Sequence, residues 1–302
     1  MSIVSDDNNF SLVLHCAAVN MRSMKVLPTV QVSLVLYHTP IETVQKTIST
    51  LLRSAERALE KEAIESLHLA IVDNSMDAGF FAQIKQWCQA LELPLPAITV
   101  SVQQSEVNLG YGAGHNLPNL QASSDLYLIL NPDVELSTDA LFESVRALSS
   151  EPSAVAVAPF ATGGDGQREF LCKRYPTVWV LLLRAFAPAW LQAKCSSQLT
   201  NYDMSDVCMG DDHIEVELAS GCYMFVRGDA LRDCGGFDDR YFMYFEDFDL
   251  SMRLRVAGTI LFAPEVKVIH HGGYAARKGL RHIFYFMRSG IRFFNQHGWR
   301  WI

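Results

Sequence analysis

The chain has 302 residues, of which 49% are hydrophobic, and its formal net charge at pH 7 is -8. That apolar share is enough for a sizeable core, built as one large domain or as two closely fused halves. The negative charge gives no support to a nucleic-acid-binding surface. The seven cysteines form no C-x-x-C pair, which argues against a disulfide framework or a zinc knuckle and favours a reducing, cytosolic location. No apolar run reaches the roughly 20 residues of a membrane-spanning helix.

From residue 30 the chain alternates strand-like and helix-like segments. Strands are predicted at 30–37, 69–72, 98–102 and 126–130, and helices between them at 41–65, 80–91 and 113–121. This β-α-β-α-β order predicts an α/β fold with a mostly parallel sheet and helices on both faces. Ligands of such sheets bind at the carboxyl ends of the strands. Polar clusters stand at three such ends, at residues 37–39, 73–75 and 131–133.

The second half of the chain is less regular. A helix is predicted at 138–149 and a strand at 155–159, and residues 161–214 have no clean period apart from the apolar stretch 178–187. Regularity returns with strands at 216–220 and 223–227, a helix at 247–257, strands near 260 and at 266–269, and a final helix at about 280–296. We therefore divide the chain into a leader (1–27), interpreted as an extension or a disordered tail, a first half (28–160), an insertion or subdomain (161–214), a second half (215–278) and a C-terminal helix (279–302).

A glycine-rich segment, NLGYGAGHN at residues 108–116, follows a strand and opens a helix. Its glycines would let the backbone approach a ligand closely, and a helix N-terminus favours an anion such as a diphosphate. The G-x-G-x-G spacing is neither that of a dinucleotide site nor that of a P-loop. A flexible turn with a helix cap is the alternative interpretation.

Asn131, Pro132 and Asp133 come directly after the apolar strand 126–130. A carboxylate at a strand end can hold a hard divalent cation, since Mg²⁺ uses one or two carboxylates together with substrate phosphates. The proline stiffens the turn and directs Asp133. Taken alone, the motif is better explained as a turn that leads into the next helix.

Five carboxylates lie within a run of aromatic residues, at 238–239 and at Glu246, Asp247 and Asp249. Carboxylates close together repel one another, so some should have raised pKa values or bind a cation. A carboxylate at a helix start among apolar rings suits general-base chemistry on a hydroxyl, and we assign this role to Asp247. Asp249 is instead expected to pair with Arg253 one helical turn later.

Two histidines, His270 and His271, end the strand predicted at 266–269. A histidine opposite a carboxylate-bound metal can be a further ligand, although a lone histidine is more often structural. Neighbouring strand residues point to opposite faces, so the spacing leaves open which of the two would bind the metal.

Taken in this order, the motifs resemble those of the family 2 glycosyltransferases of the GT-A fold, particularly bacterial rhamnosyltransferase-like members. The resemblance covers the chain from about Val30 to Phe294. It rests on the segments at 32–39, 71–75, 108–116, 130–134, 219–222, 235–238, 242–249 and 268–273, together with Arg253. It implies a GT-A fold with a Rossmann-like, mostly parallel mixed sheet, in which 28–160 is the nucleotide-sugar-binding half and 215–278 the acceptor and catalytic half.

The same resemblance implies roles for individual residues. Those assigned to the nucleotide sugar are Tyr37, His38 and Thr39 along the nucleotide, Asp73 at the pyrimidine base, and Gly110, Gly112, Asn116 and Asn131 around the sugar-nucleotide pocket. Asp133 and His270 would hold a divalent cation, Mg²⁺ or Mn²⁺. Asp247 would be the catalytic base and Glu246 would support it. Asn131 stands where the usual D-x-D motif has its first acid, which leaves one less charge on the metal.

The implied reaction is transfer of a sugar from a dTDP- or UDP-linked donor to a hydroxyl of a glycan or lipid-linked acceptor, with inversion. Rhamnose as the sugar rests on the resemblance alone. The C-terminal helix mixes aromatic and arginine residues, which is typical of a packed helix and also of one that contacts a membrane surface, so the protein is expected in the cytoplasm or at the inner face of the membrane. The alternatives are a nucleotidyltransferase, which should have a basic glycine-rich signature near the first strand, and a catalytically inactive sugar-nucleotide-binding scaffold.

Overall fold

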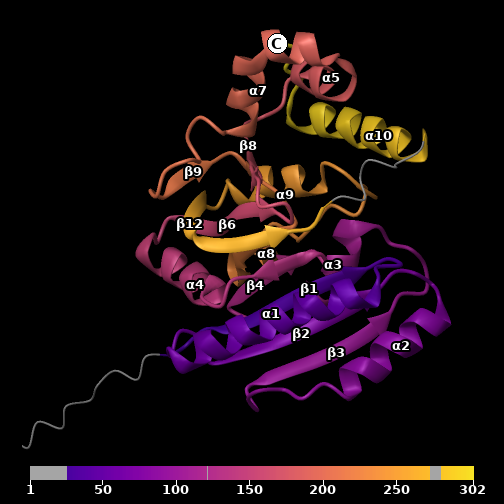
Figure 1. Cartoon of the computed structure of the whole chain (residues 1–302), viewed down its shortest axis with the longest axis vertical. Coiled ribbons are helices and arrows are strands. Elements are labelled where there is room, and N and C mark those ends of the chain that lie inside the picture. Colours follow the sequence, from indigo (N-terminus) through magenta and orange to yellow (C-terminus); the bar gives the residue numbers. More distant parts are fainter. Residues whose placement is uncertain (1–25, 121, 273–279) are drawn as a thin grey trace, which may run out of the picture.

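The computed structural model describes residues 26–120, 122–272 and 280–302, so the expected leader lies almost wholly outside the described residues. The first half contains the predicted elements in the predicted order (Figure 1): β1 (Thr29–Leu36), α1 (Ile41–Glu60), β2 (Ser66–Asp73), α2 (Ala78–Gln89), β3 (Ile98–Gln104), α3 (Tyr111–Asn119), β4 (Leu126–Leu130), β5 (Val134–Leu136), α4 (Ala140–Ser150) and β6 (Ala154–Gly163). The short strand β5 had no counterpart in the sequence prediction.

The second half adds two strands and three helices in the irregular region and then completes the sheet. The irregular region contains β7 (Arg168–Glu169), β8 (Cys172–Lys173), α5 (Val178–Phe186), α6 (Ala189–Lys194) and α7 (Ser196–Asp203). After it come β9 (Ile214–Val216), β10 (Leu218–Ala219), β11 (Tyr223–Arg227), α8 (Gly228–Asp233), α9 (Glu246–Leu254), β12 (Thr259–His270) and α10 (Leu280–His297).

The main sheet has the strand order β3-β2-β1-β4-β11-β6-β12-β5, with β7 beside β6 and β9 beside β12. Strands β3, β2, β1 and β4 run parallel to one another, and so do β6 and β12, whereas β11 is antiparallel to both of its neighbours. The prediction of a mixed, mostly parallel sheet is therefore confirmed.

Two predicted strand boundaries are wrong for local reasons. The strands predicted near 260 and at 266–269 are one strand, β12, whose register with β6 shifts between Ala263 and Lys267. Pro264 lies in this gap, where its missing N–H is tolerated because a bulge interrupts the hydrogen-bond ladder. The single strand predicted at 216–220 is divided between β9, which pairs with β12, and β10, which pairs with β8.

Helices cover both faces of the sheet because the side chains of each strand alternate between two cores. On β4, Leu126, Leu128 and Leu130 belong to the core under α1, α2 and α4, whereas Tyr127 and Ile129 belong to the core beneath α8 and α9. Burial on both faces explains why β4 is a continuous apolar run.

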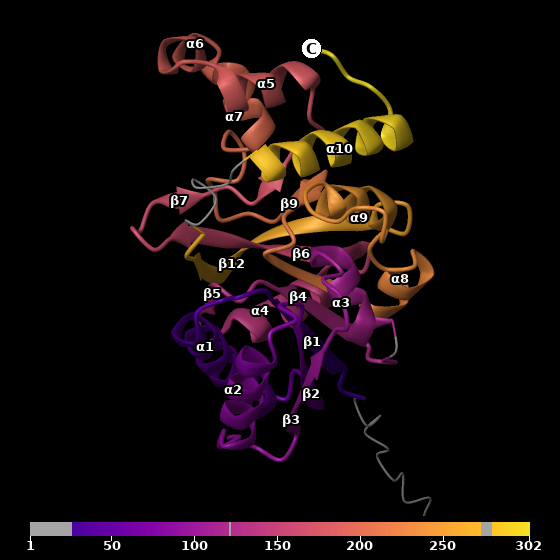
Figure 2. The same cartoon turned by 90° about the vertical axis from the view of Figure 1, so that its right-hand side faces the viewer.

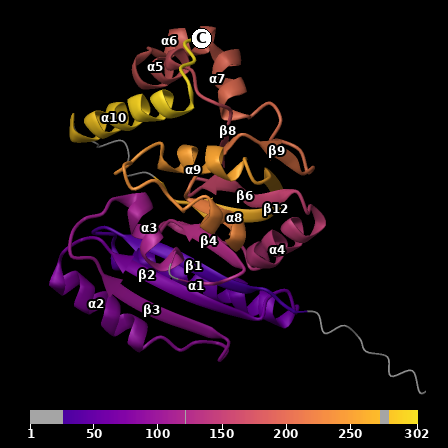
Figure 3. The same cartoon turned by 180° about the vertical axis from the view of Figure 1, so that it is seen from behind.

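A third, aromatic cluster joins the C-terminal helix to the rest of the molecule. Tyr175, Tyr241, Phe245, Phe293 and Phe294 are all buried in it. Three views show α5, α7 and α10 together at the end of the molecule away from β1, β2 and β3, next to α9 (Figures 1, 2 and 3).

Within the described residues no helix combines the length and the apolar character needed to span a membrane. The six cysteines among these residues carry free thiols.

The glycine-rich segment is fixed by contacts with other parts of the protein. Gly110 precedes α3 at φ +82°, and a Cβ there would lie 2.1 Å from the carbonyl oxygen of Phe242. A Cβ on Gly112 would lie 2.9 Å from the side chain of Phe237. The backbone approaches that the structure describes are therefore to the segment 237–242, which they hold against the N-terminal end of α3.

Replacing Gly110 by alanine tests this contact, with Gly235→Ala as the matched control. Gly235 has a similar φ of +76° but open space where its Cβ would be, so both variants carry the cost of a left-handed residue, about 1–2 kcal/mol. Only Gly110→Ala also meets a carbonyl oxygen. We expect it to lower the free energy of unfolding by a further 1–3 kcal/mol or so, measured by urea denaturation. Equal losses in the two variants would contradict the contact.

Candidate active site

The carboxyl ends of three neighbouring parallel strands bring the first group of predicted residues to one edge of the sheet. Tyr37, His38 and Thr39 follow β1, while Asp73 ends β2 and Asn131 follows β4. Tyr37 is 54% exposed, and its ring lies edge-on to that of His38 with the centroids 4.7 Å apart. His38 has φ +49°, a conformation that turns the chain away from the sheet. These side chains are accessible at the position predicted for the nucleotide.

Asp73 lies at the same edge, but its side chain is fully buried. One carboxylate oxygen accepts a hydrogen bond from the backbone N–H of Ser75 at 2.8 Å, and the other accepts one from Nε2 of Gln104 at 3.0 Å. Gln104 was not identified from the sequence, because it ends a strand whose apolar alternation gives it no distinction. Base binding by Asp73 stays a prediction, and Gln104 is the neighbour that a base would meet with it.

Asn116 connects α3 to the acidic segment. Its side-chain oxygen accepts from the backbone N–H of Phe237 at 2.9 Å, and its nitrogen donates to the carbonyl of Phe237 at 2.8 Å and to Asp239 at 2.7 Å. The amide thus bonds both backbone groups of one residue. This fixes the start of the acidic segment, whereas a direct contact of Asn116 with a nucleotide sugar remains a prediction.

The turn formed by residues 220–222 lies between the predicted metal-binding and catalytic acids. The backbone N–H of Asn131, two residues before Asp133, donates to the carbonyl of Cys222 at 2.8 Å. The backbone N–H of Gly221 donates to Oδ2 of Asp247 at 3.0 Å. The Tyr111 hydroxyl donates to the carbonyl of Gly221 at 2.6 Å.

Both acids lie close enough to this turn to act electrostatically on it. The pKa of Tyr111 is raised, first by burial and then by negative charges that include Glu246, Asp247 and Asp133. Burial raises the pKa of the Cys222 thiol to about 12, and Asp133 and Asp247 both add to the shift. The chain therefore brings Asp133 and Asp247 to one neighbourhood, although each lines its own hollow.

Asp247 lies in the first turn of α9, behind two residues with unusual backbone geometry. Tyr244 and Phe245 have φ values of +69° and +64°, and this tight reversal sets the start of the helix at Glu246. Burial raises the pKa of Asp247, opposed by hydrogen bonds from the backbone N–H groups of Gly221 and Phe248. A carboxylate with a raised pKa at a cavity wall is suited to accept a proton.

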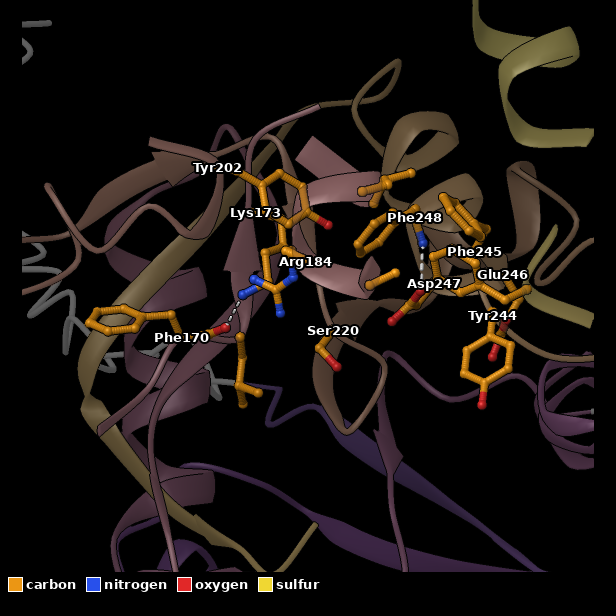
Figure 4. A pocket seen from close by; sticks show the side chains of 14 residues that line it. Phe170, Lys173, Arg184, Tyr202, Ser220, Tyr244, Phe245, Glu246, Asp247 and Phe248 are labelled. Atoms are coloured by element: carbon orange, nitrogen blue, oxygen red, sulfur yellow. Dashed lines mark hydrogen bonds between the residues drawn. The ribbon is translucent and has the colours of Figure 1, made fainter. Parts of the chain in front are cut away.

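Asp247 and Glu246 line a cavity of about 460 Å³ (Figure 4). Across the cavity from Asp247 stand Lys173 and Arg184, which come from β8 and α5. Both cations bond the carboxylate of Asp203, at 2.9 Å and 2.5 Å. Burial lowers the pKa of Lys173, and Asp203 partly offsets this effect. The cavity thus has an acidic wall and a cationic wall.

Asp133 faces His270 at the end of β12. The His270 Nε2 atom is 3.7 Å from Oδ1 of Asp133, and its Nδ1 atom is 2.8 Å from a carboxylate oxygen of Glu169. His271 instead bonds Glu135 at 2.8 Å. Of the two histidines, the structure therefore places the His270 ring beside the Asp133 side chain. Asp133 also lines a hollow of about 380 Å³ with Glu135, His271 and the start of α1.

In the part of the chain that the structure describes, no three or more His, Cys, Asp or Glu side chains are grouped so that they could hold an ion. The other residues that sequence reasoning missed are Glu169, Lys173 and Arg184. All three come from the region without a clean period, where a two-residue strand and a nine-residue helix leave no pattern to read.

The expected pairing of Asp249 with Arg253 is confirmed. The two side chains are 2.7 Å apart at their closest oxygen and nitrogen atoms. Asp249 is fully buried and also accepts hydrogen bonds at 2.8 Å from Gln296 and His297 at the end of α10. Its role is therefore to dock α10 on α9.

The fold is of the GT-A type, as the sequence predicted. The structure is similar to that of GalNAc-T7 solved with UDP, GalNAc and Mn²⁺, with a TM-score of 0.56 and 13% identity, over 82% of this chain and 44% of that one. It is also similar to the mannosyltransferase PcManGT from Pyrobaculum calidifontis in complex with GDP-Man and Mn²⁺, with a TM-score of 0.55 and 14% identity, over 83% of this chain and 59% of that one.

Two relatives are similar in sequence. The chain is 29% identical over 186 residues to the N-acetylglucosaminyl-diphospho-decaprenol L-rhamnosyltransferase of Mycobacterium tuberculosis, a match that covers 56% of this chain and 57% of that protein. It is 26% identical over 197 residues to the rhamnosyltransferase WbbL of Escherichia coli K12, over 61% and 70% of the two chains. No protein-family model matches the chain. The resemblance to rhamnosyltransferases inferred from the motifs is confirmed by these relatives.

The raised pKa of Asp247 predicts that this carboxylate costs stability at neutral pH. A carboxyl group with a raised folded-state pKa destabilises the protein above that pKa, and the cost disappears as pH falls towards the unfolded value. We expect Asp247→Asn to melt at a higher temperature than the unsubstituted protein at pH 8, with a difference that shrinks on acidification. Melting curves from pH 8 to pH 4 measure this. A difference that is constant over this range, or that grows in acid, would contradict the shift.

Proposed function

We propose that this protein is a family 2, inverting, metal-dependent glycosyltransferase. It moves a sugar, rhamnose by similarity to its relatives, from a dTDP- or UDP-linked donor to a hydroxyl of a glycan or lipid-linked acceptor in cell-surface polysaccharide synthesis. The observation that carries the proposal is the placement of Asp247, with its raised pKa, in a cavity wall and bonded to the turn 220–222, which also bonds Asn131 at the end of β4. The relatives support the reaction class.

The chemistry is a single displacement in which Asp247 is the base. The acceptor oxygen forms a bond to the anomeric carbon as the bond from that carbon to the donor phosphate breaks, and the nucleoside diphosphate departs. The hydroxyl proton goes to Asp247. Backbone N–H groups of Gly221 and Phe248 hold one carboxylate oxygen each, so the orientation of the base is set before the acceptor arrives. The raised pKa makes the carboxylate a stronger base.

The residues near Asp133 fit a divalent cation. Asp133 Oδ1 is buried and accepts no hydrogen bond from the described residues. When His270 donates from Nδ1 to Glu169, the lone pair of Nε2 faces that oxygen across 3.7 Å. This separation is within the span of two metal–ligand bonds of about 2.0–2.1 Å each. Bound there, Mg²⁺ or Mn²⁺ would stabilise the charge of the departing diphosphate.

Asn131 supports a site in which the substrate completes the coordination. It stands where a second acid would otherwise add charge, so the protein supplies one carboxylate and one imidazole, and the donor phosphates supply the remaining ligands. We therefore propose that metal and donor bind together. We place the reaction in the cytoplasm, at the inner face of the membrane, where a lipid-linked acceptor would be reached by peripheral contact.

The substitution Asp247→Asn tests the base. We expect transfer to fall by at least roughly a hundredfold, with the affinity for nucleoside diphosphate within about twofold of the unsubstituted protein. Asp211→Asn, at an exposed loop position, is the matched control and should keep full activity. Release of nucleoside diphosphate measures turnover and calorimetry measures binding. Retained turnover in Asp247→Asn would exclude the assignment, and release of inorganic pyrophosphate would indicate a nucleotidyltransferase.

Glu169→Gln tests the orientation of His270. The amide can donate to Nδ1 as well as accept from it, so the lone pair at Nε2 is no longer fixed. We expect Mn²⁺ affinity in the presence of UDP to fall about 10–100-fold, measured by calorimetry and by the Mn²⁺ dependence of turnover. The control is Glu265→Gln, which changes another histidine–glutamate pair, at 2.7 Å from His213. Unchanged Mn²⁺ affinity in Glu169→Gln would remove His270 from the metal site.

A further inference from the structure

An apolar groove of about 560 Å³ runs between α5 and α10, outside the site described above. Its volume is in the range of pockets that hold small apolar ligands, roughly 300–1,000 Å³. The two helices form opposite walls, and the residues that line the groove are mostly aliphatic and aromatic, among them Val178, Leu182, Phe186, Ile283, Met287 and Ile291.

Several apolar side chains on the walls of the groove are exposed to solvent. Phe186 is 70% exposed and Met287 is 59% exposed. On the same helix α10, Phe293 is buried in the aromatic cluster and does not line the groove. The helix therefore already has a packed face, and its groove face is a second apolar surface. Contiguous exposed apolar surface of this kind marks a binding site.

The groove lies directly beside the cavity of Asp247. Five residues line both spaces, and they come from α5, α10 and the two positions before α9: Leu181, Ala185, Tyr244, Phe245 and Phe286. Arg184 projects from the same helix turn of α5 into the cavity, opposite Asp247 (Figure 4). Arg184 and Lys173 share one carboxylate, Asp203. Two cations thus share one anion on this wall, while Glu246 and Asp247 stand on the opposite wall of the cavity.

The apolar groove thus lies beside a cavity that offers two cations on one wall and a base for a hydroxyl on the other. A polyisoprenyl diphosphate sugar presents the matching groups: an apolar chain, an anionic diphosphate and a sugar hydroxyl. A second copy of this chain or an apolar peptide would match the groove alone. We propose that the α5–α10 groove binds the isoprenoid chain of such an acceptor, with its diphosphate at Arg184 and Lys173. This inference rests on the proposed function and names its acceptor class.

Farnesyl diphosphate, a soluble isoprenyl diphosphate without a sugar, is the probe for this site. Binding is measured by calorimetry in EDTA, so that a metal-dependent diphosphate site cannot contribute. We expect Met287→Glu, which places a charge in the groove, to weaken binding roughly tenfold or more. Phe284→Glu is the matched control, because Phe284 is 60% exposed on the same helix but does not line the groove. It should leave binding within about twofold.

A second pair of measurements tests the cationic wall. Arg184→Gln should weaken farnesyl diphosphate roughly tenfold while leaving the weaker binding of farnesol unchanged, whereas Met287→Glu should weaken both. No binding of farnesyl diphosphate, or equal losses in Met287→Glu and Phe284→Glu, would overturn the proposal. Equal losses of binding to phosphatidylglycerol vesicles in the two variants, with no specific effect on the probe, would indicate a membrane-facing surface instead. If the probe does not bind and gel filtration shows that Met287→Glu abolishes dimerisation, the groove binds a second copy of this chain instead.

The proposal for the groove and the proposed reaction can be refuted independently of each other. Farnesyl diphosphate binding needs neither donor nor metal, so it survives if the protein transfers no sugar. Conversely, hydrolysis of the nucleotide sugar by water needs no acceptor lipid. If the proposed function and this inference both hold, Met287→Glu keeps donor hydrolysis and loses transfer to a polyprenyl diphosphate sugar through a raised KM, whereas Phe284→Glu keeps both.

Discussion

The buried carboxylate of Asp249 is the interaction on which both the cavity and the groove depend. It accepts from Arg253 on its own helix and from Gln296 and His297 on α10. A buried charge is stable only when it is paired and hydrogen-bonded, and removing one partner of such a group is strongly destabilising. The same carboxylate thus fixes α9, which presents Asp247 two residues earlier, and α10, which forms one wall of the groove. The geometry of the Asp247 cavity and that of the groove are therefore set together.

A sequence can reveal the first half of this fold because its strands are buried on both faces and its polar residues stand at strand ends. It reveals less where spatial partners decide the outcome. The glycines at 110 and 112 indicated a close backbone approach, but the described neighbours are Phe242 and Phe237, which no local pattern identifies. Glu169 sits on a two-residue strand and becomes meaningful only beside His270. The strands predicted near 260 and at 266–269 are one strand, because a bulge between Ala263 and Lys267 lets β12 continue.

The pKa of Asp247 stays raised although two cations, Lys173 and Arg184, stand on the opposite wall of the cavity. Lys173 does lower the pKa of Asp247, but burial is the larger effect. Both Lys173 and Arg184 are already bonded to Asp203, so part of their charge is balanced on their own side of the cavity. An anionic phosphate group could then pair with Lys173 and Arg184 while the pKa of Asp247 stays raised.

The two walls of the groove come from chain segments that contribute nothing to the strand ends around Asp73 and Asn131. Helix α5 belongs to the region between β8 and β9, and α10 follows β12. Mutations that reshape the groove can therefore accumulate without disturbing the edge of the sheet. Divergence among homologous proteins should then be uneven along the chain, with α5 and α10 remodelled while β1, β2 and β4 are inherited nearly intact.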